Sequence, residues 1–198
     1  ESYRIISENT AEHFSFSRSQ LSNQSYPSST MGAMALIRQL YYDAEWYSQG
    51  LSKSKDLAIE SVIDNREIPK LFDANDKLNV YRAAKISAEL NLNFVIKGSG
   101  KEYENVRELK KFNNKLIIPV NFPSPFDVTN AQLNDKLTIN QLRYWNQAPS
   151  NLGILESNGI VFSITSADLK NDFVGIHPQL RHMPPKASFS MIATFSPN

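Results

Sequence analysis

Two carboxylates, Asp73 and Asp168, each follow a short apolar run that has the composition of a buried strand. A carboxylate in this position can carry a proton or bind a metal ion, provided that a substrate or ion comes within hydrogen-bond reach. Either residue could instead cap the helix that follows it. After Asp73, however, either Asn75 or Asp76 is the natural cap of a helix that begins near Lys77. Asp73 is therefore available for another role.

Lys97 is the last residue of another apolar run. An unpaired lysine would cost several kcal/mol if it were buried, roughly the desolvation penalty of one charge, so it needs a carboxylate or solvent. We expect Lys97 to pair with Asp73 across adjacent parallel strands. Ser99 and Asn121 also lie just after strand ends. The sequence thus predicts a binding edge, whose substrate-binding residues are Asp73, Asn75, Lys97 and Asn121.

The elements that would position these groups alternate between strands and helices. Such alternation favours an α/β fold with a parallel sheet, in which ligands bind at the carboxyl ends of the strands. We expect about four parallel βα units joined by right-handed crossovers. The expected strands are 70–74, 94–97, 116–120 and 160–164, and the expected helices are 31–47, 54–63, 77–90, 101–112, 138–145 and 150–157.

A chain of 198 residues with 41% hydrophobic content suits a single domain. We expect a loop-rich segment over 1–29, with one short strand at most, near the apolar patch Tyr3–Ile6. The βα core spans 30–170, and an irregular segment spans 171–198. A complete eight-fold (β/α) barrel needs about 250 residues, so a barrel would require strands that this chain lacks.

Composition excludes several kinds of partner and site. The net charge of +1, from 21 basic and 20 acidic residues, supplies no field that would attract nucleic acid. The absence of cysteine excludes disulfides and thiolate zinc sites. No segment has the roughly 20 apolar residues of a membrane span. The three histidines, His13, His177 and His182, do not follow strands or share helical spacing, so we expect no histidine zinc site.

The turn after the second strand contains Gly98 and Gly100, in the string GSGKEY. Backbone N–H groups at the start of a helix can hold a phosphate, but the string lacks the complete phosphate-loop pattern. A tight turn in which glycine supplies an unusual backbone conformation is the favoured interpretation. Phosphate binding is the alternative.

Four longer strings carry a resemblance to a known family. They resemble the imidazolonepropionase-like branch of the amidohydrolase superfamily, particularly its exported bacterial members. The likeness covers about residues 20–170, whereas 1–19 and 172–198 match poorly. The strings are YPSSTMGAMALIRQLYYDAEWY, LFDANDKLNVYRAAKISAELNLNFVIKGSGKEY, IIPVNFPSPFDV and LRYWNQAPSNLGILESNGIVFSIT.

The resemblance implies a (β/α)8 barrel whose active members bind one or two divalent metals such as zinc and hydrolyse an amide or cyclic amide. When the sequence is aligned with the family's barrel strands, Asp73 ends the fifth strand, at the position of a ligand histidine. Gly98 stands at the second histidine position, on the sixth strand. Asp168 matches the aspartate of the eighth strand, which binds metal and accepts a proton. Because Gly98 supplies no side-chain ligand, the standard binuclear site cannot form from this chain. The first four strands would also precede Glu1.

Two functions follow from these expectations. One is metal-assisted hydrolysis of a C–N bond in a small molecule, with Asp168 as the catalytic residue. The other is a ligand-binding or inactive barrel remnant that has lost the metal site. The open sheet edge before residue 70 would favour a homodimer. Only the resemblance suggests export or a periplasmic location.

Overall fold

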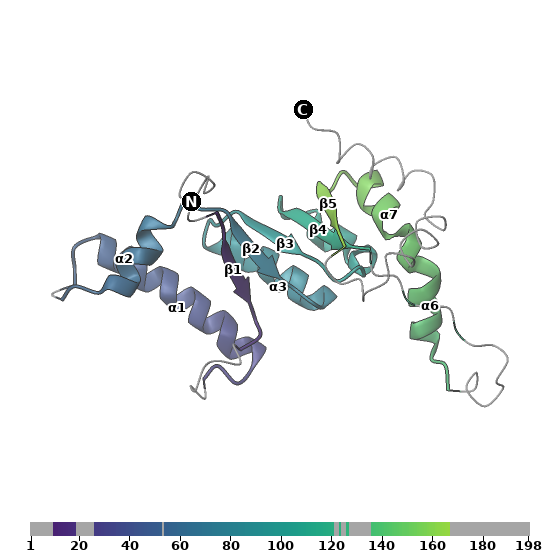
Figure 1. The fold of residues 1–198 in the computed structure, drawn as a ribbon, viewed down its shortest axis with the longest axis horizontal. Coiled ribbons are helices and arrows are strands. Elements are labelled where there is room, and N and C mark those ends of the chain that lie inside the picture. Colours follow the sequence, from purple (N-terminus) through teal and green to yellow (C-terminus); the bar gives the residue numbers. More distant parts are fainter. Residues whose placement is uncertain are drawn as a thin grey trace, which may run out of the picture.

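The computed structural model describes residues 10–18, 26–52, 54–120, 123, 126 and 136–166. Within them, five strands form one sheet in the order of the sequence, and every neighbouring pair is parallel (Figure 1). The α/β class and the parallel sheet are therefore confirmed. The strands are β1 (Glu12–Ser15), β2 (Lys70–Asp73), β3 (Phe94–Lys97), β4 (Lys115–Pro119) and β5 (Phe162–Thr165).

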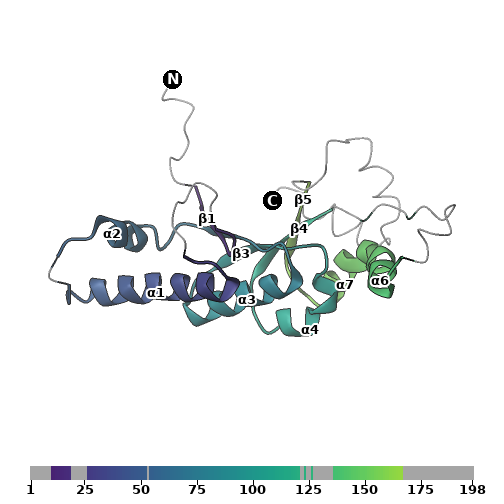
Figure 2. The ribbon, with the colours of Figure 1, turned by 90° about the horizontal axis from the view of Figure 1, so that it is seen from below.

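Parallel neighbours require long connections, and helices supply them. Figure 2 shows α1, α3, α4 and α7 in a layer along one side of the strands. The described helices are α1 (Thr30–Ser48), α2 (Leu57–Asp64), α3 (Lys77–Glu89), α4 (Val106–Leu109), α6 (Ile139–Gln147) and α7 (Asn151–Ser157), with short 3-10 turns η2 (Glu102–Glu104) and η3 (Ala148–Ser150). No helix in these ranges is long and apolar enough to cross a membrane.

The core lies between the sheet and this helical layer. Alternate strand residues such as Phe72, Ile96 and Ile118 are fully buried against α3 and α7, whereas Leu71 and Val95 between them are only half-buried. Side chains alternate across a strand, so the second face of the sheet is the less covered one. The polar residues at the strand ends stand at the rim of this sheet.

Strand β1 corrects the sequence analysis, which expected four strands and placed the only apolar patch of 1–29 at Tyr3–Ile6. Residues 12–15 pair in parallel with β2, and Phe14 and Phe16 each lie against the ring of Phe72. The alternation in HFSF was the overlooked signal, because a period of two indicates a strand. The edge before residue 70 is thus covered, and β1 is an outer strand of the described sheet.

A second correction concerns the helix expected over 101–112. The structure instead has η2 and α4 there, separated at Asn105. The Glu102 side chain points back toward the preceding turn and accepts a hydrogen bond from Ser99 N. The Asn105 N–H donates to the Glu102 carbonyl, which gives the tighter hydrogen-bond pattern of a 3-10 turn. The apolar spacing in this segment predicted a helix correctly but could not show this interruption.

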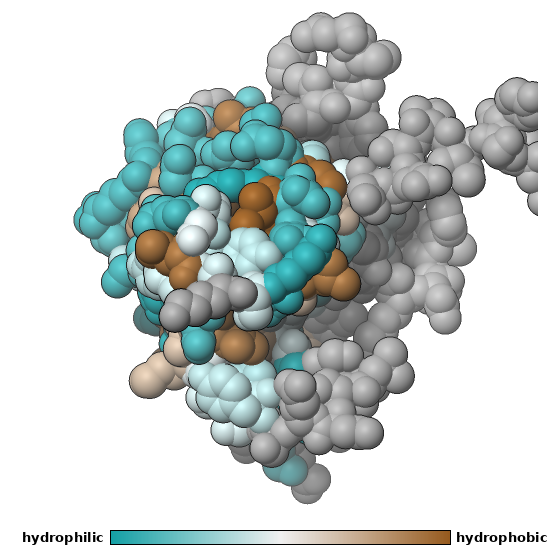
Figure 3. Space-filling view, turned by 90° about the vertical axis from the view of Figure 1, so that its left-hand side faces the viewer, coloured by the Kyte–Doolittle hydropathy of each residue, from teal (hydrophilic) through white to brown (hydrophobic). Residues whose placement is uncertain are grey.

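The far end of the molecule is formed by α1 and α2. Its exposed apolar side chains include Trp46, Leu51 and Leu57. Figure 3 views this end and shows the apolar areas separated by hydrophilic surface. Scattered apolar side chains of this kind are normal on a protein surface.

Lys70 is a buried cation at the start of β2, with 2% of its side chain exposed. Its Nζ donates to the carbonyls of Asn65, Arg66 and Ile68 at 2.9, 2.8 and 3.0 Å, and lies 3.4 Å from Glu12 Oε2. These carbonyls follow the last turn of α2, where backbone acceptors lack helical partners. Lys70 therefore joins α2, β1 and β2.

We predict that Lys70→Met lowers the free energy of unfolding by about 2–4 kcal/mol, because buried carbonyls lose a charged donor. Urea denaturation measures this change. The control is Lys85→Met on the exposed face of α3, which should change stability by less than about 0.5 kcal/mol. Equal effects of the two substitutions would contradict the role given to Lys70.

Candidate functional site

A pocket of about 220 Å³ lies at the carboxyl ends of β2, β3 and β4, and we call it the strand-end pocket. Three of the four predicted substrate-binding residues, Asp73, Asn75 and Lys97, line it. The fourth, Asn121, and the predicted catalytic and metal-binding residue, Asp168, lie outside the described residues. The remaining lining residues are Gly98, Ser99, Pro119 and Tyr144.

The predicted ion pair between Asp73 and Lys97 is present. The two residues are register partners on β2 and β3, and Lys97 Nζ lies 3.6 Å from Asp73 Oδ1. The Asp73 side chain is 59% exposed and that of Lys97 is 26% exposed. Such a solvated pair contributes only about 0–1 kcal/mol to stability. Both side chains line the strand-end pocket, and most of the Asp73 carboxylate surface is exposed.

Asp76 caps α3, which decides between the two caps, Asn75 and Asp76, that the sequence left open. Its Oδ2 accepts a hydrogen bond from Leu78 N at 3.1 Å. Because Asp76 performs this task, neither Asp73 nor Asn75 is needed to cap the helix. Both can face the strand-end pocket instead.

The turn after β3 encloses a carboxylate that the sequence analysis did not single out. Glu102 is fully buried, and its Oε1 accepts hydrogen bonds from Ser99 N at 2.5 Å and Gly100 N at 3.1 Å. Its Oε2 accepts from Asn151 Nδ2 at 2.9 Å, and Asn151 Oδ1 accepts from Tyr103 N at 2.8 Å. A buried carboxylate needs such partners. These hydrogen bonds connect the turn after β3 to Asn151, the first residue of α7.

This network decides between the two interpretations of the glycine turn. Gly100 has a φ of +83°, which favours glycine. The N–H groups of Ser99 and Gly100, which a phosphate would need, already donate to Glu102. The turn is therefore a tight glycine turn that holds a carboxylate of its own chain.

Gly98 has no space for a side chain. A Cβ at this position would lie 2.4 Å from Glu102 Oε1 and 2.8 Å from Glu102 Cδ. The position to which the resemblance assigns a ligand histidine is thus filled by the Glu102 carboxylate. Asp73 alone remains at these two strand ends, and the described residues contain no group of three potential metal ligands. The ends of β2 and β3 therefore do not fit the metal site that the resemblance implies.

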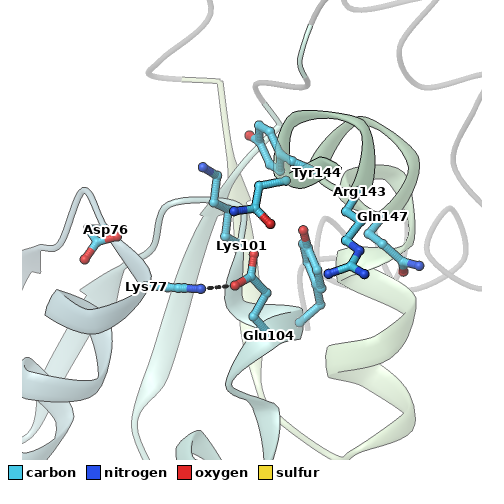
Figure 4. A pocket seen from close by; sticks show the side chains of 9 residues that line it. Asp76, Lys77, Lys101, Glu104, Arg143, Tyr144 and Gln147 are labelled. Atoms are coloured by element: carbon cyan, nitrogen blue, oxygen red, sulfur yellow. Dashed lines mark hydrogen bonds and ion pairs between the residues drawn. The ribbon is translucent and has the colours of Figure 1, made fainter. Parts of the chain in front are cut away.

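A larger pocket of about 640 Å³ lies beside the strand-end pocket, and we call it the helix-side pocket (Figure 4). Tyr144 lines both pockets. Lys77 forms an ion pair with Glu104, and Lys101 Nζ lies 4.2 Å from the centroid of the Tyr144 ring. The other lining residues are Asp76, Tyr103, Asn140, Arg143 and Gln147.

Both tyrosines of this pocket are protonated at neutral pH. Burial, reinforced by the negative charge of Glu104, raises the pKa of Tyr103 to about 12. Burial and the charge of Glu102 also raise the pKa of Tyr144 above its ordinary value. Their phenol groups can therefore donate hydrogen bonds. This pocket was not predicted from the sequence, although Asn140, Arg143, Tyr144 and Gln147 share helical spacing.

The fold is similar to that of an amidohydrolase from Thermotoga maritima MSB8. The TM-score is 0.54 at 18% sequence identity, over 81% of this chain and 43% of that one. The chain thus spans less than half the length of that protein. No family model and no curated protein sequence matches the chain. At this identity the likeness shows a similarity of fold.

We predict that Gly98→Ala lowers the free energy of unfolding by about 1–3 kcal/mol, because the added methyl group overlaps the Glu102 carboxylate. The cost should fall by at least about 1 kcal/mol in a Glu102→Ala background, where that overlap is absent. A double-mutant cycle by urea denaturation measures this coupling. The same cost in both backgrounds would contradict the contact.

Proposed function

We propose that the chain is part of an amidohydrolase-type (β/α)8 barrel that hydrolyses the C–N bond of an amide or cyclic amide. The parallel sheet and the likeness to the Thermotoga maritima protein support a partial barrel. The imidazolonepropionase-like branch rests on the sequence resemblance. In barrels of this type the strand ends carry the chemistry, and in this chain they carry the polar pocket.

In this proposal the described strand ends bind the substrate. The observation that carries it is the meeting of Asp73, Asn75 and Lys97 around one pocket. The Asp73 carboxylate can accept a hydrogen bond from an amide N–H, and the Lys97 ammonium can donate one to the amide carbonyl. Asn75 can do either. An amide presents both a donor and an acceptor, so this combination matches it.

The ends of β2 and β3 do not provide a complete set of ligands for the metal that the resemblance implies. Gly98 supplies no side chain, and Asp73 is paired with Lys97. A divalent metal held by Asp168, which would accept the proton of the attacking water, remains a proposal from the resemblance. The proposed role of the described residues is binding and orientation of the amide.

A second candidate function is binding without hydrolysis. The contact between Glu102 and Gly98 favours this second candidate. The Glu102 carboxylate occupies the space that a histidine side chain at position 98 would need. Such a protein would retain the barrel and a small-molecule ligand but no metal. Self-association remains a prediction under either candidate, with β1 and β5 as the outer strands of the described sheet, and sedimentation would measure it.

We predict that small amides such as hydantoin, dihydrouracil and succinamide bind at the strand-end pocket. Asp73→Asn and Lys97→Gln should each weaken binding by about tenfold, the value of one charged hydrogen bond. NMR titration of the backbone amides measures both affinity and location. The controls are Asp43→Asn on α1 and Lys85→Gln on α3, which should bind as the unaltered chain does. Equal affinity of all variants would contradict the assignment.

Metal content separates the two candidates. The purified chain, Asp168→Ala and Asp73→Asn would be analysed for Zn, Mn, Fe and Ni, and the amides would be assayed for hydrolysis. Stoichiometric metal that is lost in Asp168→Ala supports hydrolysis, and metal in none of the proteins supports binding alone. We expect Asp73→Asn to leave the metal content unchanged, and loss of metal in this variant would contradict our account of the strand ends.

A further inference from the structure

Helix α1 carries a second line of uncharged residues on the side that faces away from the core. Its core face consists of buried residues at helical spacing, Ala33, Ile37, Tyr41 and Ala44. A surface helix normally places its charged residues on the opposite face. On α1 that face instead consists of five exposed, uncharged residues, which we call the outer row: Met31, Ala35, Gln39, Tyr42 and Trp46. Met31 is 80% exposed, and Tyr42 and Trp46 are each 50% exposed.

The outer row is continuous, unlike the scattered apolar side chains at the far end of the molecule. Its members follow at spacings of four, four, three and four residues, so they form one line along about four turns of the helix. The neighbouring charge of Arg38 is neutralised, because its guanidinium donates to both Glu89 oxygens at 2.7 and 2.8 Å. No described helix or strand lies beyond α1 on the side away from the sheet (Figure 2). A helix that is apolar on both faces is normally covered on both.

The residues of the outer row are arranged symmetrically, which fits a second copy of the same helix. Consider an antiparallel pair of α1 helices centred just before Gln39. Met31 lies as far before this centre as Trp46 lies after it, and the same holds for Ala35 and Tyr42. Met31 therefore faces the partner's Trp46, and Ala35 faces the partner's Tyr42. A methionine sulfur packs favourably on an aromatic ring, and the small alanine leaves space for the tyrosine ring.

The charges along α1 fit the same antiparallel arrangement. The first turn contains no acidic residue and the last turn no basic one, so neither end of the helix dipole is compensated by its own turn. In the antiparallel pair, the exposed Glu45 of each copy lies beside the first turn of the other copy. The two dipoles also place opposite ends together. The outer face of α1 is thus complementary to itself in both shape and charge.

We propose that the chain forms a homodimer in which the outer rows of two α1 helices pack in antiparallel orientation. The same patch serves both copies, as a two-fold symmetric interface requires. This interface lies on the helical layer and not on the outer strands of the sheet, and it is independent of the proposed function.

The area of the outer row sets the strength of this dimer. A buried aromatic side chain covers about 150–250 Å². The half-exposed rings of Tyr42 and Trp46 in two copies therefore contribute about 300–500 Å². Stable complexes bury about 1,200–2,000 Å² in total. The dimer is accordingly weak and reversible, with a dissociation constant in the micromolar range or above.

Sedimentation of the full chain over a range of concentrations tests the dimer. The unaltered chain should pass reversibly from monomer to dimer as its concentration rises. Trp46→Glu should weaken dimerisation by at least about tenfold, because its carboxylate would lose water in the interface. The matched control is Leu57→Glu, which introduces the same charge at another exposed apolar residue, on α2 and outside the outer row. It should dimerise as the unaltered chain does.

Circular dichroism would verify that both variants are folded. A chain that stays monomeric at millimolar concentration overturns the proposal, because the outer row would then not bind a second copy. Association that survives Trp46→Glu also overturns it, since the contact would then lie elsewhere, for instance at the outer strands of the sheet.

Cysteine cross-linking tests the antiparallel arrangement separately from the effect of Trp46→Glu. The chain contains no cysteine, so a single introduced cysteine can form a disulfide only with a second copy. Gln39 lies next to the two-fold axis, where the same position of both copies comes within the Cα separation of about 7 Å that a disulfide allows. Gln39→Cys should therefore give a disulfide-linked dimer under mild oxidation.

The control for this register is Ala35→Cys, an equally exposed position of the same row. Its two copies would lie about 10 Å apart along the helix axis, from the rise of 1.5 Å per residue, so it should not cross-link. Equal cross-linking of the two variants, or none in Gln39→Cys, would overturn the antiparallel dimer.

Discussion

The arrangement of the described site depends on one buried carboxylate. Glu102 has no exposed surface, and a charge in that environment is tolerated only when hydrogen bonds replace its water. The backbone of the glycine turn and the amide of Asn151 provide those bonds. The same bonds fix the end of β3 against α7. Lys97 on one side of the turn and Lys101 on the other are thereby positioned along the two pockets.

This interaction also determines which side chains the end of β3 can carry. A ligand side chain at position 98 and the Glu102 carboxylate would require the same space. The polar groups that line the strand-end pocket, Asp73, Asn75 and Lys97, can donate and accept hydrogen bonds. The similarity to the Thermotoga maritima protein is one of fold, and one fold supports many functions.

Much of the fold could be predicted from local patterns. The β-branched runs at Phe94–Lys97 and Leu116–Val120 and the periodicity of α1 and α3 depend on neighbouring residues, so the sequence shows them directly. The Asp73–Lys97 pair was also predictable, because a lysine at the end of an apolar strand needs a partner. β1 was missed because Phe14 and Phe16 alternate with polar residues, so the segment lacks the continuous apolar run by which the other strands were recognised. Its pairing partner, β2, also begins far along the chain, at Lys70.

The role of Glu102 could not be predicted from its neighbourhood. Its partner Asn151 is 49 residues away, and only the folded chain brings them together. Glu102 looked like one more charge on a solvated helix, and the polar row of α6 looked like a helix surface. Local sequence shows which residues can donate or accept. It does not show which of them share a pocket, and this required the tertiary structure.

Amide hydrogen exchange at Ser99 and Gly100 would show whether Glu102 holds the glycine turn. If the Glu102 carboxylate accepts their N–H groups, both amides exchange slowly although they lie in a turn, and Glu102→Ala makes them exchange rapidly while Glu104→Ala does not. Rapid exchange at both positions in the unaltered chain would contradict the account, because the turn would then not be held by Glu102.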